Sequence, residues 1–331
     1  MTTPRAAVAF ALITAAALAL TGCGSGTAPG GAGGPAGGAA PAGGAADALP
    51  TTDVLAGVRR DEAAIRLLPA DVRERGTLAL ASAVGSPPSS AYLPDGRTFV
   101  GIDADVADAV AKALGLKLKR EVAGFEAILP ALGSGKYDVG TGNFGVTEER
   151  RKSIDFVTYV NDGQGFAARA DSDLAAVTDL VQLCGRKVAT GAGTTFERTL
   201  EEQKDRCAQA GKPAYEVNVF NEPGAVWMSL QQGRSDVVMS TINGIRYAVR
   251  QQPGTKFLNE YRRLDVGFAF KKGTALAPAF QAAVNGLKAD GSYDRILRKW
   301  GVTASAIPAS RISPPEIPGP VPGGAKAATP K

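Results

Sequence analysis

The residues of this sequence best suited to hold a small anion lie in the stretch GTGNFGVTEERR, at positions 140–151. Its first six residues form the pattern G-x-G-x-x-G, which in a dinucleotide-binding turn leads directly into a helix. Here the helix begins only after Thr147, and Asp162, at about the distance expected for a ribose-binding acid, follows an apolar run. The glycine pattern alone is weak evidence, so we assign no dinucleotide site to it.

Arg150 gives this stretch a different chemistry. Thr147 is a good N-cap, two glutamates follow it in the first helical turn, and Arg150 comes next. A guanidinium beside a glycine-rich strand end can hold a carboxylate in a bidentate manner, while free backbone N–H groups complete its coordination. Taken alone, Arg150 could equally be a solvated side chain or half of an ion pair.

A second stretch, KVATGAGTTFERTL at 187–200, has a similar character. A strand leads into Gly-Ala-Gly, and a helix begins at Thr194 and Thr195. The first N–H groups of a helix have no partner within it and favour an anion. Turn glycines and ordinary helix caps would explain this stretch by itself, but two anion-favouring ends in one chain favour a shared carboxylate site.

The composition excludes several kinds of site. The chain of 331 residues contains no histidine, which excludes Ser-His-Asp and Cys-His catalysis and metal sites built on imidazole. Its three cysteines include no CxxC pair, which excludes zinc ribbons and thioredoxin-like motifs. The formal net charge is +5, but the basic residues form short groups without interleaved aromatics, as on solvated faces. We therefore expect no metal, no cofactor and no nucleic-acid partner.

The N-terminus predicts export. Arg5 precedes an apolar run at 6–20, which is too short to span a membrane comfortably. The run ends in LTGC, which resembles a bacterial lipobox and predicts a signal peptide at 1–22 and a lipid on Cys23. The alternative is an ordinary cleaved signal with an incidental cysteine.

Two further segments have compositions that cannot pack a core, and two cysteines lie between them. Residues 23–51 are rich in Gly, Ala and Pro and are predicted to be a flexible tether, while the Pro/Gly-rich tail at 305–331 is predicted to be disordered. In an exported chain, oxidising surroundings predict a disulfide between Cys184 and Cys207. Two buried thiols are the alternative.

Between these segments strands and helices alternate, which predicts an α/β fold. The stretch 102–115 is a clear helix, because its apolar residues recur at helical spacing, Asp103 can cap its start and Gly115 can end it. There is also a faint repeat: PALGSGKYDVGTGN at 130–143 resembles MSLQQGRSDVVMST at 228–241. Unless the match is chance, it predicts two similar lobes with a ligand cleft at their strand ends.

Several longer stretches resemble the family 3 (polar amino acid) extracytoplasmic solute-binding proteins of bacterial ABC importers, over about residues 67–300. They are GIDADVADAVAKALG, FEAILPALGSGKYDVGTGNFGVTEERRKSIDF, GRKVATGAGTTFE and GFAFKKG with LKADGSYDRILRKWG. The resemblance implies a two-lobed, type II periplasmic-binding-protein-like α/β fold that closes on its ligand by hinge bending. Lobe 1 would comprise 52–162 and 266–304, and lobe 2 would comprise 163–265. LCGRKV with CAQAGKPA resembles a paired-cysteine variant of the family, which supports the disulfide.

The resemblance also implies the residues that hold the ligand. Arg150 matches the arginine that binds the ligand's α-carboxylate, and Phe125 matches the aromatic residue that flanks its side chain. The other predicted ligand-binding residues are Ser86, Asn143, Phe144, Gly145, Gly193, Thr194, Thr195 and Thr241.

Three positions depart from the family's pattern. Thr241 stands where the family usually has an aspartate for the α-ammonium, Ser86 lies where an aromatic is usual, and Gly145 lacks the expected hydroxyl. A carboxylate is therefore well provided for and an ammonium is not, although Glu126 or Glu222 could substitute. We hypothesise a carboxylate-bearing polar solute that need not be a standard α-amino acid.

Together these inferences predict a monomeric, non-enzymatic, lipid-anchored protein on the extracytoplasmic face of the bacterial cell membrane. It would capture a small polar solute by lobe closure and deliver it to ABC permease subunits. One alternative is a ligand sensor on the same fold that signals through a partner. A less favoured alternative is a cyclohexadienyl-dehydratase-like enzyme, which needs an acid where this chain has Thr241.

Overall fold

The computed structural model describes residues 48–319. The predicted signal peptide, the predicted lipidation site at Cys23 and nearly all of the predicted tether lie outside these residues, as does the tail from position 320. Within the described part, no helix combines the length and the apolar character needed to cross a membrane.

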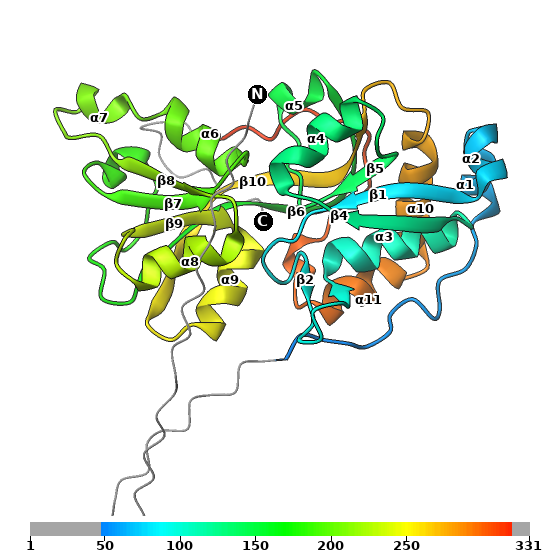
Figure 1. Ribbon diagram of the computed structural model, residues 1–331, viewed down its shortest axis with the longest axis horizontal. Coiled ribbons are helices and arrows are strands. Elements are labelled where there is room, and N and C mark those ends of the chain that lie inside the picture. Colours follow the sequence, from blue (N-terminus) through cyan, green and yellow to red (C-terminus); the bar gives the residue numbers. More distant parts are fainter. Residues whose placement is uncertain (1–47, 320–331) are drawn as a thin grey trace, which may run out of the picture. The chain divides into compact units, whose positions relative to one another are not determined.

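One eight-stranded sheet runs through the described part of the chain (Figure 1). Its strand order is β4-β1-β5-β10-β6-β9-β7-β8, and a separate hairpin pairs β2 (Ala91–Tyr92) with β3 (Phe99–Val100). The sheet strands are β1 (Thr77–Ser82), β4 (Lys117–Val122), β5 (Val139–Thr141), β6 (Ile154–Arg169), β7 (Lys187–Gly191), β8 (Glu216–Phe220), β9 (Val237–Thr241) and β10 (Thr255–Lys271).

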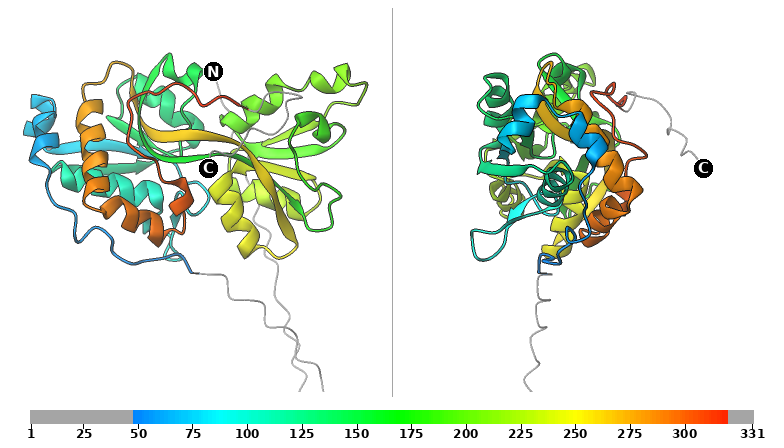
Figure 2. Two further views of the ribbon diagram at one scale, coloured as in Figure 1. Left: turned by 180° about the vertical axis from the view of Figure 1, so that it is seen from behind. Right: turned by 90° about the vertical axis from the view of Figure 1, so that its right-hand side faces the viewer.

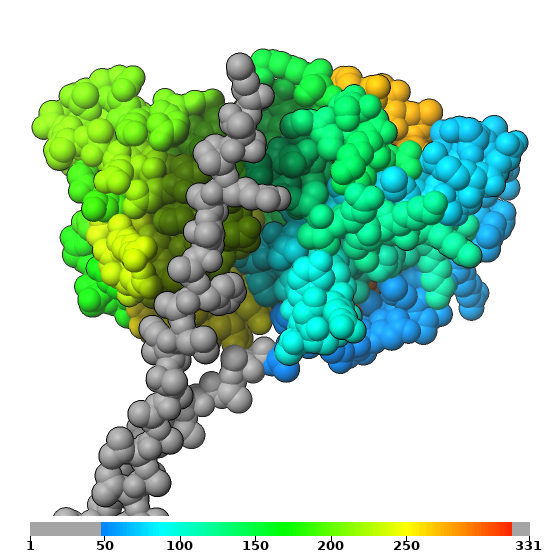
Figure 3. Space-filling view, viewed as in Figure 1, coloured from blue at the N-terminus to red at the C-terminus, as the bar shows by residue number. Residues whose placement is uncertain are grey.

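Helices cover both faces of the sheet in each of two lobes (Figures 1 and 2). We call the half with β4, β1 and β5 lobe 1, and the half with β9, β7 and β8 lobe 2. Lobe 1 packs α3 (Ile102–Ala113), α10 (Ala277–Ala289) and α11 (Ser292–Lys299) into one apolar cluster and α4 (Phe125–Gly133) into another. Lobe 2 packs α6 (Thr195–Glu202) on one face and α8 (Pro223–Gln231) and α9 (Ile242–Gln251) on the other. The surface is hollowed between the lobes (Figure 3).

The smaller elements lie outside the sheet and the helices just described. At the N-terminal side of lobe 1 are α1 (Glu62–Arg66) and α2 (Ala70–Arg75), and lobe 2 carries the 3-10 turn η1 (Leu180–Leu183) and α7 (Arg206–Gln209). A second 3-10 turn, η2 (Thr303–Ser305), follows α11. The predicted disulfide between Cys184 and Cys207 is confirmed, with the two Cα atoms 5.6 Å apart, and it joins the end of η1 to α7.

Two long antiparallel strands, β6 and β10, connect the lobes. Their pairing runs from Ile154 opposite Lys271 in lobe 1 to Arg169 opposite Thr255 in lobe 2. Among the described strands, β5 pairs with β10 only in lobe 1 and β9 pairs with β6 only in lobe 2. The sequence pattern did not indicate their length, because glycines and charged residues interrupt the apolar alternation near the crossing point. The predicted lobe boundaries at 162/163 and 265/266 stay a prediction.

The predicted disorder of the tail is wrong for residues 305–319, which we call the C-terminal strap (red in Figure 1). The strap lies along the part of β6 where one edge pairs with β10 and the other edge pairs with no strand of the sheet. Thr158 N–H donates to Arg311 O over 3.0 Å, and Ser313 N–H donates to Phe156 O over 2.9 Å. An uncovered strand leaves backbone groups without partners, so this exposed edge orders a segment whose composition alone suggested disorder.

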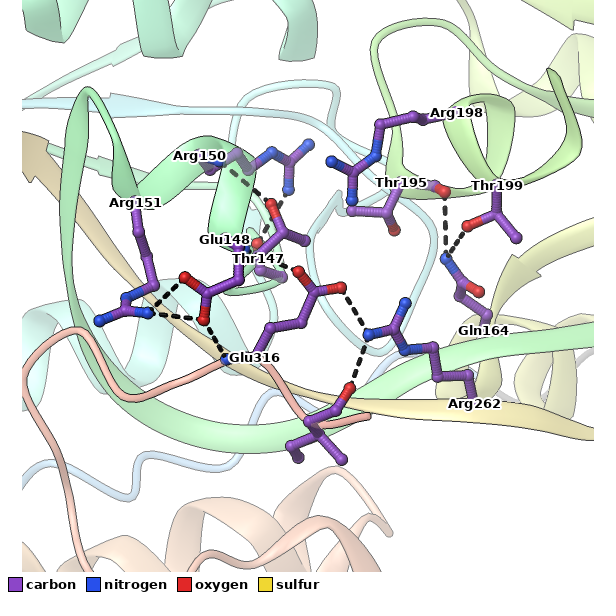
Figure 4. A network of polar contacts seen from close by, with 12 residues as sticks. Thr147, Glu148, Arg150, Arg151, Gln164, Thr195, Arg198, Thr199, Arg262 and Glu316 are labelled. Carbon is purple, nitrogen blue, oxygen red and sulfur yellow. Dashed lines mark hydrogen bonds and ion pairs between the residues drawn. The ribbon is translucent and has the colours of Figure 1, made fainter. Parts of the chain in front are cut away.

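The strap also reaches lobe 2 through Glu316 (Figure 4). One carboxylate oxygen accepts from the Glu148 N–H over 2.7 Å, at the start of α5 (Glu148–Arg151) in lobe 1. The other oxygen pairs with Arg262, on the lobe 2 half of β10, over 2.5 Å. The two side chains of this ion pair are only 14% and 16% exposed. The strap therefore fastens the helix that carries Arg150 to the opposite lobe.

Glu316→Gln should lower the free energy of unfolding by about 1.5–3 kcal/mol, because it leaves a largely buried guanidinium without its counter-ion. Urea unfolding of the full chain measures the effect. The control is Glu149→Gln, which removes an ion pair with Lys152 whose side chains are 61% and 72% exposed. That change should leave the free energy of unfolding almost unchanged, because solvent screens an exposed ion pair. Equal, small losses in both variants would contradict a fastening role for Glu316.

Candidate ligand-binding site

A cavity of about 330 Å³ lies between the two lobes. Lobe 1 contributes the loop after β1, the start of α4, the segment after β5 and α5. Lobe 2 contributes the carboxyl ends of β7, β8 and β9 with the helix starts that follow them. This is the position at which α/β sheets bind ligands. Much of the wall is apolar, formed by Val84, Val122, Phe125, Phe196, Phe220, Val226 and Trp227.

Eight of the ten predicted ligand-binding residues line this cavity: Ser86, Phe125, Asn143, Gly145, Arg150, Thr194, Thr195 and Thr241. Their contact with a ligand stays a prediction. Phe144 does not line the cavity, because it is completely buried and packs its ring behind that of Phe125, with the centroids 4.8 Å apart. Gly193 lies just outside the lining, and its N–H is already bonded to Glu197 Oε2 over 2.7 Å.

Arg150 lies between the lobes and contacts backbone carbonyls of both. Its own N–H donates to the hydroxyl of Thr147, which caps α5. Its guanidinium donates to Gly145 O of lobe 1 and to Gly193 O of lobe 2, each over 3.1 Å (Figure 4 shows the side chain). Arg150 forms no ion pair with any described residue. Burial lowers the pKa of Arg150 to about 10, and the positive charge of Arg198 adds to this, but the group stays charged at neutral pH.

The start of α6 faces the cavity from lobe 2. The Thr194 hydroxyl accepts the Glu197 N–H over 3.2 Å and donates to Gly191 O over 2.7 Å, so it fixes the helix start and is itself occupied. Buried Gln164 of β6 donates to Thr195 O over 3.0 Å. It ties the helix start to β6, one of the two strands that connect the lobes, which we call the hinge strands. The N–H groups of Thr195 and Phe196 have no acceptor among residues 48–319. We call these two N–H groups and Arg150 the carboxylate clamp.

Asn143 is held by a buried polar network beneath the cavity, although its side-chain Oδ1 has no hydrogen-bond partner among residues 48–319. Its backbone, at a φ of 53°, donates N–H to Asp103, and its amide donates to Asp162, both over 2.9 Å. The Tyr159 hydroxyl also donates to Asp103 over 2.6 Å, and Asn243 of lobe 2 donates its N–H to Asp162 over 3.1 Å. The expectation that Asp103 caps α3 is wrong, since the cap residue is Gly101.

Burial dominates the electrostatics of this network. It raises the pKa of Asp103 to about 7 and also raises the pKa of Asp162. Hydrogen bonds to each carboxyl act in the opposite direction, and the charge of Asp162 adds to the rise at Asp103. Sequence reasoning missed this network. The sequence feature that could have revealed it is Asp103, an acid on the inward face of the helix 102–115, where most other residues are apolar.

Thr241, at the position where the resemblance implies an aspartate, has a structural role. Thr241 caps α9, its hydroxyl accepting the Gly244 N–H over 3.0 Å, so it adds no negative charge to the cavity. Of the two acids that could replace the missing aspartate, Glu222 lines the cavity and Glu126 does not. Sequence reasoning also missed Phe220 and Trp227, whose position in the wall depends on where β8 and α8 pack.

Comparisons with known proteins agree with this geometry. A family model described as "Bacterial extracellular solute-binding proteins, family 3" matches residues 78–303. The chain is similar to the arginine-binding protein ArgT of Corynebacterium glutamicum, with 26% identity over 250 residues that cover 75% of this chain and 81% of ArgT. It is also similar to the ABC transporter glutamine-binding protein GlnH of Bacillus subtilis, with 30% identity over 219 residues that cover 62% and 74% of the two chains.

A solved structure of an ancestral arginine-binding protein bound to arginine matches the fold. The TM-score is 0.62 and the identity 33%, and the match covers 68% of this chain and 98% of that one. The predicted two-lobed, periplasmic-binding-protein-like α/β fold is thereby confirmed. The relatives named here are binding proteins rather than enzymes, which agrees with the predicted absence of catalysis.

Asp103→Asn should change how stability depends on pH. The pKa of this carboxyl rises from an ordinary 3.8 to about 7, so between pH 4 and 7 the folded state binds more protons than the unfolded state. The free energy of unfolding of the native protein therefore falls as pH rises through this window. The variant lacks the group, so its stability relative to the native protein should rise from pH 4 to pH 7, by at most about 4 kcal/mol.

Thermal or urea unfolding at a series of pH values measures this difference. Asp171→Asn, at a side chain that is 82% exposed, is the control and should show no such trend. A difference between Asp103→Asn and the native protein that stays constant from pH 4 to pH 7 would count against a protonated, buried carboxyl at this position.

Proposed function

The chain belongs to the family 3 bacterial extracellular solute-binding proteins, and from this premise we propose that it captures a small carboxylate-bearing solute by closing its lobes. The observation that carries the proposal is the carboxylate clamp. Arg150 of lobe 1, which has no counter-ion among the described residues, lies beside the free N–H groups at the start of α6 in lobe 2. A carboxylate between them would satisfy a cation and a helix N-terminus together.

The proposed ligand class is an amino acid or an amino-acid-like solute. The relatives that bind arginine and glutamine support this, as does a cavity of about 330 Å³ with mainly apolar walls and a few polar groups. We further propose that a lipid on Cys23 anchors the protein to the outer face of the cell membrane, and that ABC permease subunits receive the solute. The LTGC sequence supports the anchor, and the relationship to an ABC transporter protein supports the permease.

Arg150→Ala should weaken binding of a carboxylate ligand by about 1.5–3 kcal/mol, the range for a hydrogen bond to a charged group. Arg198→Ala is the matched control, because Arg198 lies near Arg150 but outside the cavity lining, and it should change affinity by less than about 0.5 kcal/mol. Calorimetry measures both, and circular dichroism checks that each variant folds. Unchanged affinity in Arg150→Ala would remove the basis of the proposal.

The ligand for these measurements comes from a thermal-shift screen of amino acids, betaines, ectoines and small carboxylates. A ligand that binds only the folded state must raise the melting temperature. At a hundredfold excess over its dissociation constant it adds about 2.7 kcal/mol to the free energy of unfolding. If no carboxylate compound shifts the melting temperature, the proposed ligand class is wrong.

Gly193→Ala should weaken the same ligand severalfold by obstructing lobe closure. Gly193 has a φ of +68°, and a Cβ there would lie 3.0 Å from the Cβ of Glu126 in lobe 1. Gly211→Ala has the same backbone strain, at a φ of +66°, but meets no atom within 4 Å. Both variants should lose about 1 kcal/mol of stability, and only Gly193→Ala should lose affinity. Equal affinities in the two variants would argue against closure at this contact.

A further inference from the structure

The cavity carries one charge of each sign. Of the described residues that line it, Arg150 is the only base and Glu222 the only acid. Glu222 stands at the N-cap position of α8 but makes no capping hydrogen bond, and the next residue, Pro223, has no N–H to offer it. No other described residue forms an ion pair or a hydrogen bond with its carboxylate. The group is exposed and available to a ligand.

The two charged residues come from different parts of the cavity wall. Arg150 contacts the segment after β7, which leads into α6, whereas Glu222 follows β8, which leads into α8. β7 and β8 are neighbours in the sheet, about 4.8 Å apart, and α6 and α8 lie on opposite faces of it (Figure 1). The helix start that Arg150 contacts and the helix start that carries Glu222 therefore diverge toward opposite faces of the sheet.

The space between the charges suits a hydrocarbon chain. Phe125 projects from lobe 1, and Phe220 and Trp227 belong to the segment that carries Glu222. Aromatic side chains pack well against methylene groups, and their faces also attract a cation. Thr241, which also lines the cavity, carries no charge, and its hydroxyl already accepts from Gly244.

We propose that the ligand is an ω-cationic carboxylate, an acid with an amino or guanidino group several carbons away, and that Glu222 selects for that distant cation. The inference rests on the proposed function, since it assumes that the clamp holds the carboxylate. Glu222 is the only acid among the described lining residues, so once it holds the distant cation no acid of the lining is left for an α-ammonium. An exposed ion pair contributes little, but lobe closure removes water from the contact and strengthens it.

Calorimetry on the full chain with four probes tests the inference. δ-Guanidinovalerate carries both charges and no α-ammonium, and δ-ureidovalerate has an uncharged ureido group of the same shape in place of the guanidinium. L-Arginine and L-citrulline form the same pair with an α-ammonium added. The guanidino compound should bind at least about tenfold more tightly than the ureido compound, and no more weakly than L-arginine within about threefold.

Glu222→Gln should reduce the preference for guanidino over ureido to less than about threefold, while the affinity for δ-ureidovalerate stays the same. Glu126→Gln is the matched control, because this nearby acid does not line the cavity, and it should keep the full preference. Both side chains are exposed, so neither change should disturb the fold.

Two results would overturn the inference and leave the proposed function intact. One is equal binding of the guanidino and ureido compounds, each lost in Arg150→Ala. The other is L-arginine binding more than about tenfold tighter than δ-guanidinovalerate, which would show that an α-ammonium is required. If no carboxylate binds, or if binding does not depend on Arg150, the proposed function fails and the inference fails with it.

Discussion

The pairing of β6 with β10 is the constraint on which the rest of the structure depends. Within the described residues these two strands run through both lobes, so every contact across the cavity is set by how they pair and bend. Three register irregularities interrupt their ladder near the crossing point, at Phe257/Asn259, Glu260/Arg262 and Val266/Gly267. Such irregularities twist and bend strands. The buried carboxyl of Asp162 lies in this region, bonded to Asn143 of lobe 1 and Asn243 of lobe 2, and thereby links both lobes to the hinge.

The hinge also explains why a Pro/Gly-rich tail is ordered. Where β6 has only β10 beside it, its outer edge needs partners, and the C-terminal strap supplies them. The strap then continues to Glu316, which bonds to α5 in lobe 1 and to Arg262 on the lobe 2 half of β10. A segment with no core of its own thus contributes to the position of Arg150, because it holds the first N–H of the helix that carries it.

Local chemistry decides how much of this could be predicted from the sequence. The alternating elements gave the fold class, and the short motifs around Arg150 and Thr195 gave the clamp, because a helix start next to glycines has the same donors in any fold. The sequence could not show that Phe144 points away from the cavity, because its packing against Phe125 decides this. Nor could it show that the Gly193 N–H is already bonded, because this depends on the side-chain conformation of Glu197. From the sequence, Glu222 could be named only as one of two acids able to replace the missing aspartate. Its place in the cavity wall depends on the position of β8 at the sheet edge, which the sequence does not show.

Arg150 already has two acceptors, and this sets a condition on the ligand. A carboxylate that engages the guanidinium competes with Gly145 O and Gly193 O, and the second of these contacts is itself a tie between the lobes. A charged acceptor binds a guanidinium more strongly than a neutral carbonyl, but the ligand must also replace the lost tie. It can do so because the free N–H groups of α6 belong to the same lobe as Gly193. One carboxylate bound by both halves of the clamp therefore restores the connection that it displaces, whereas an anion bound by Arg150 alone would loosen the lobes.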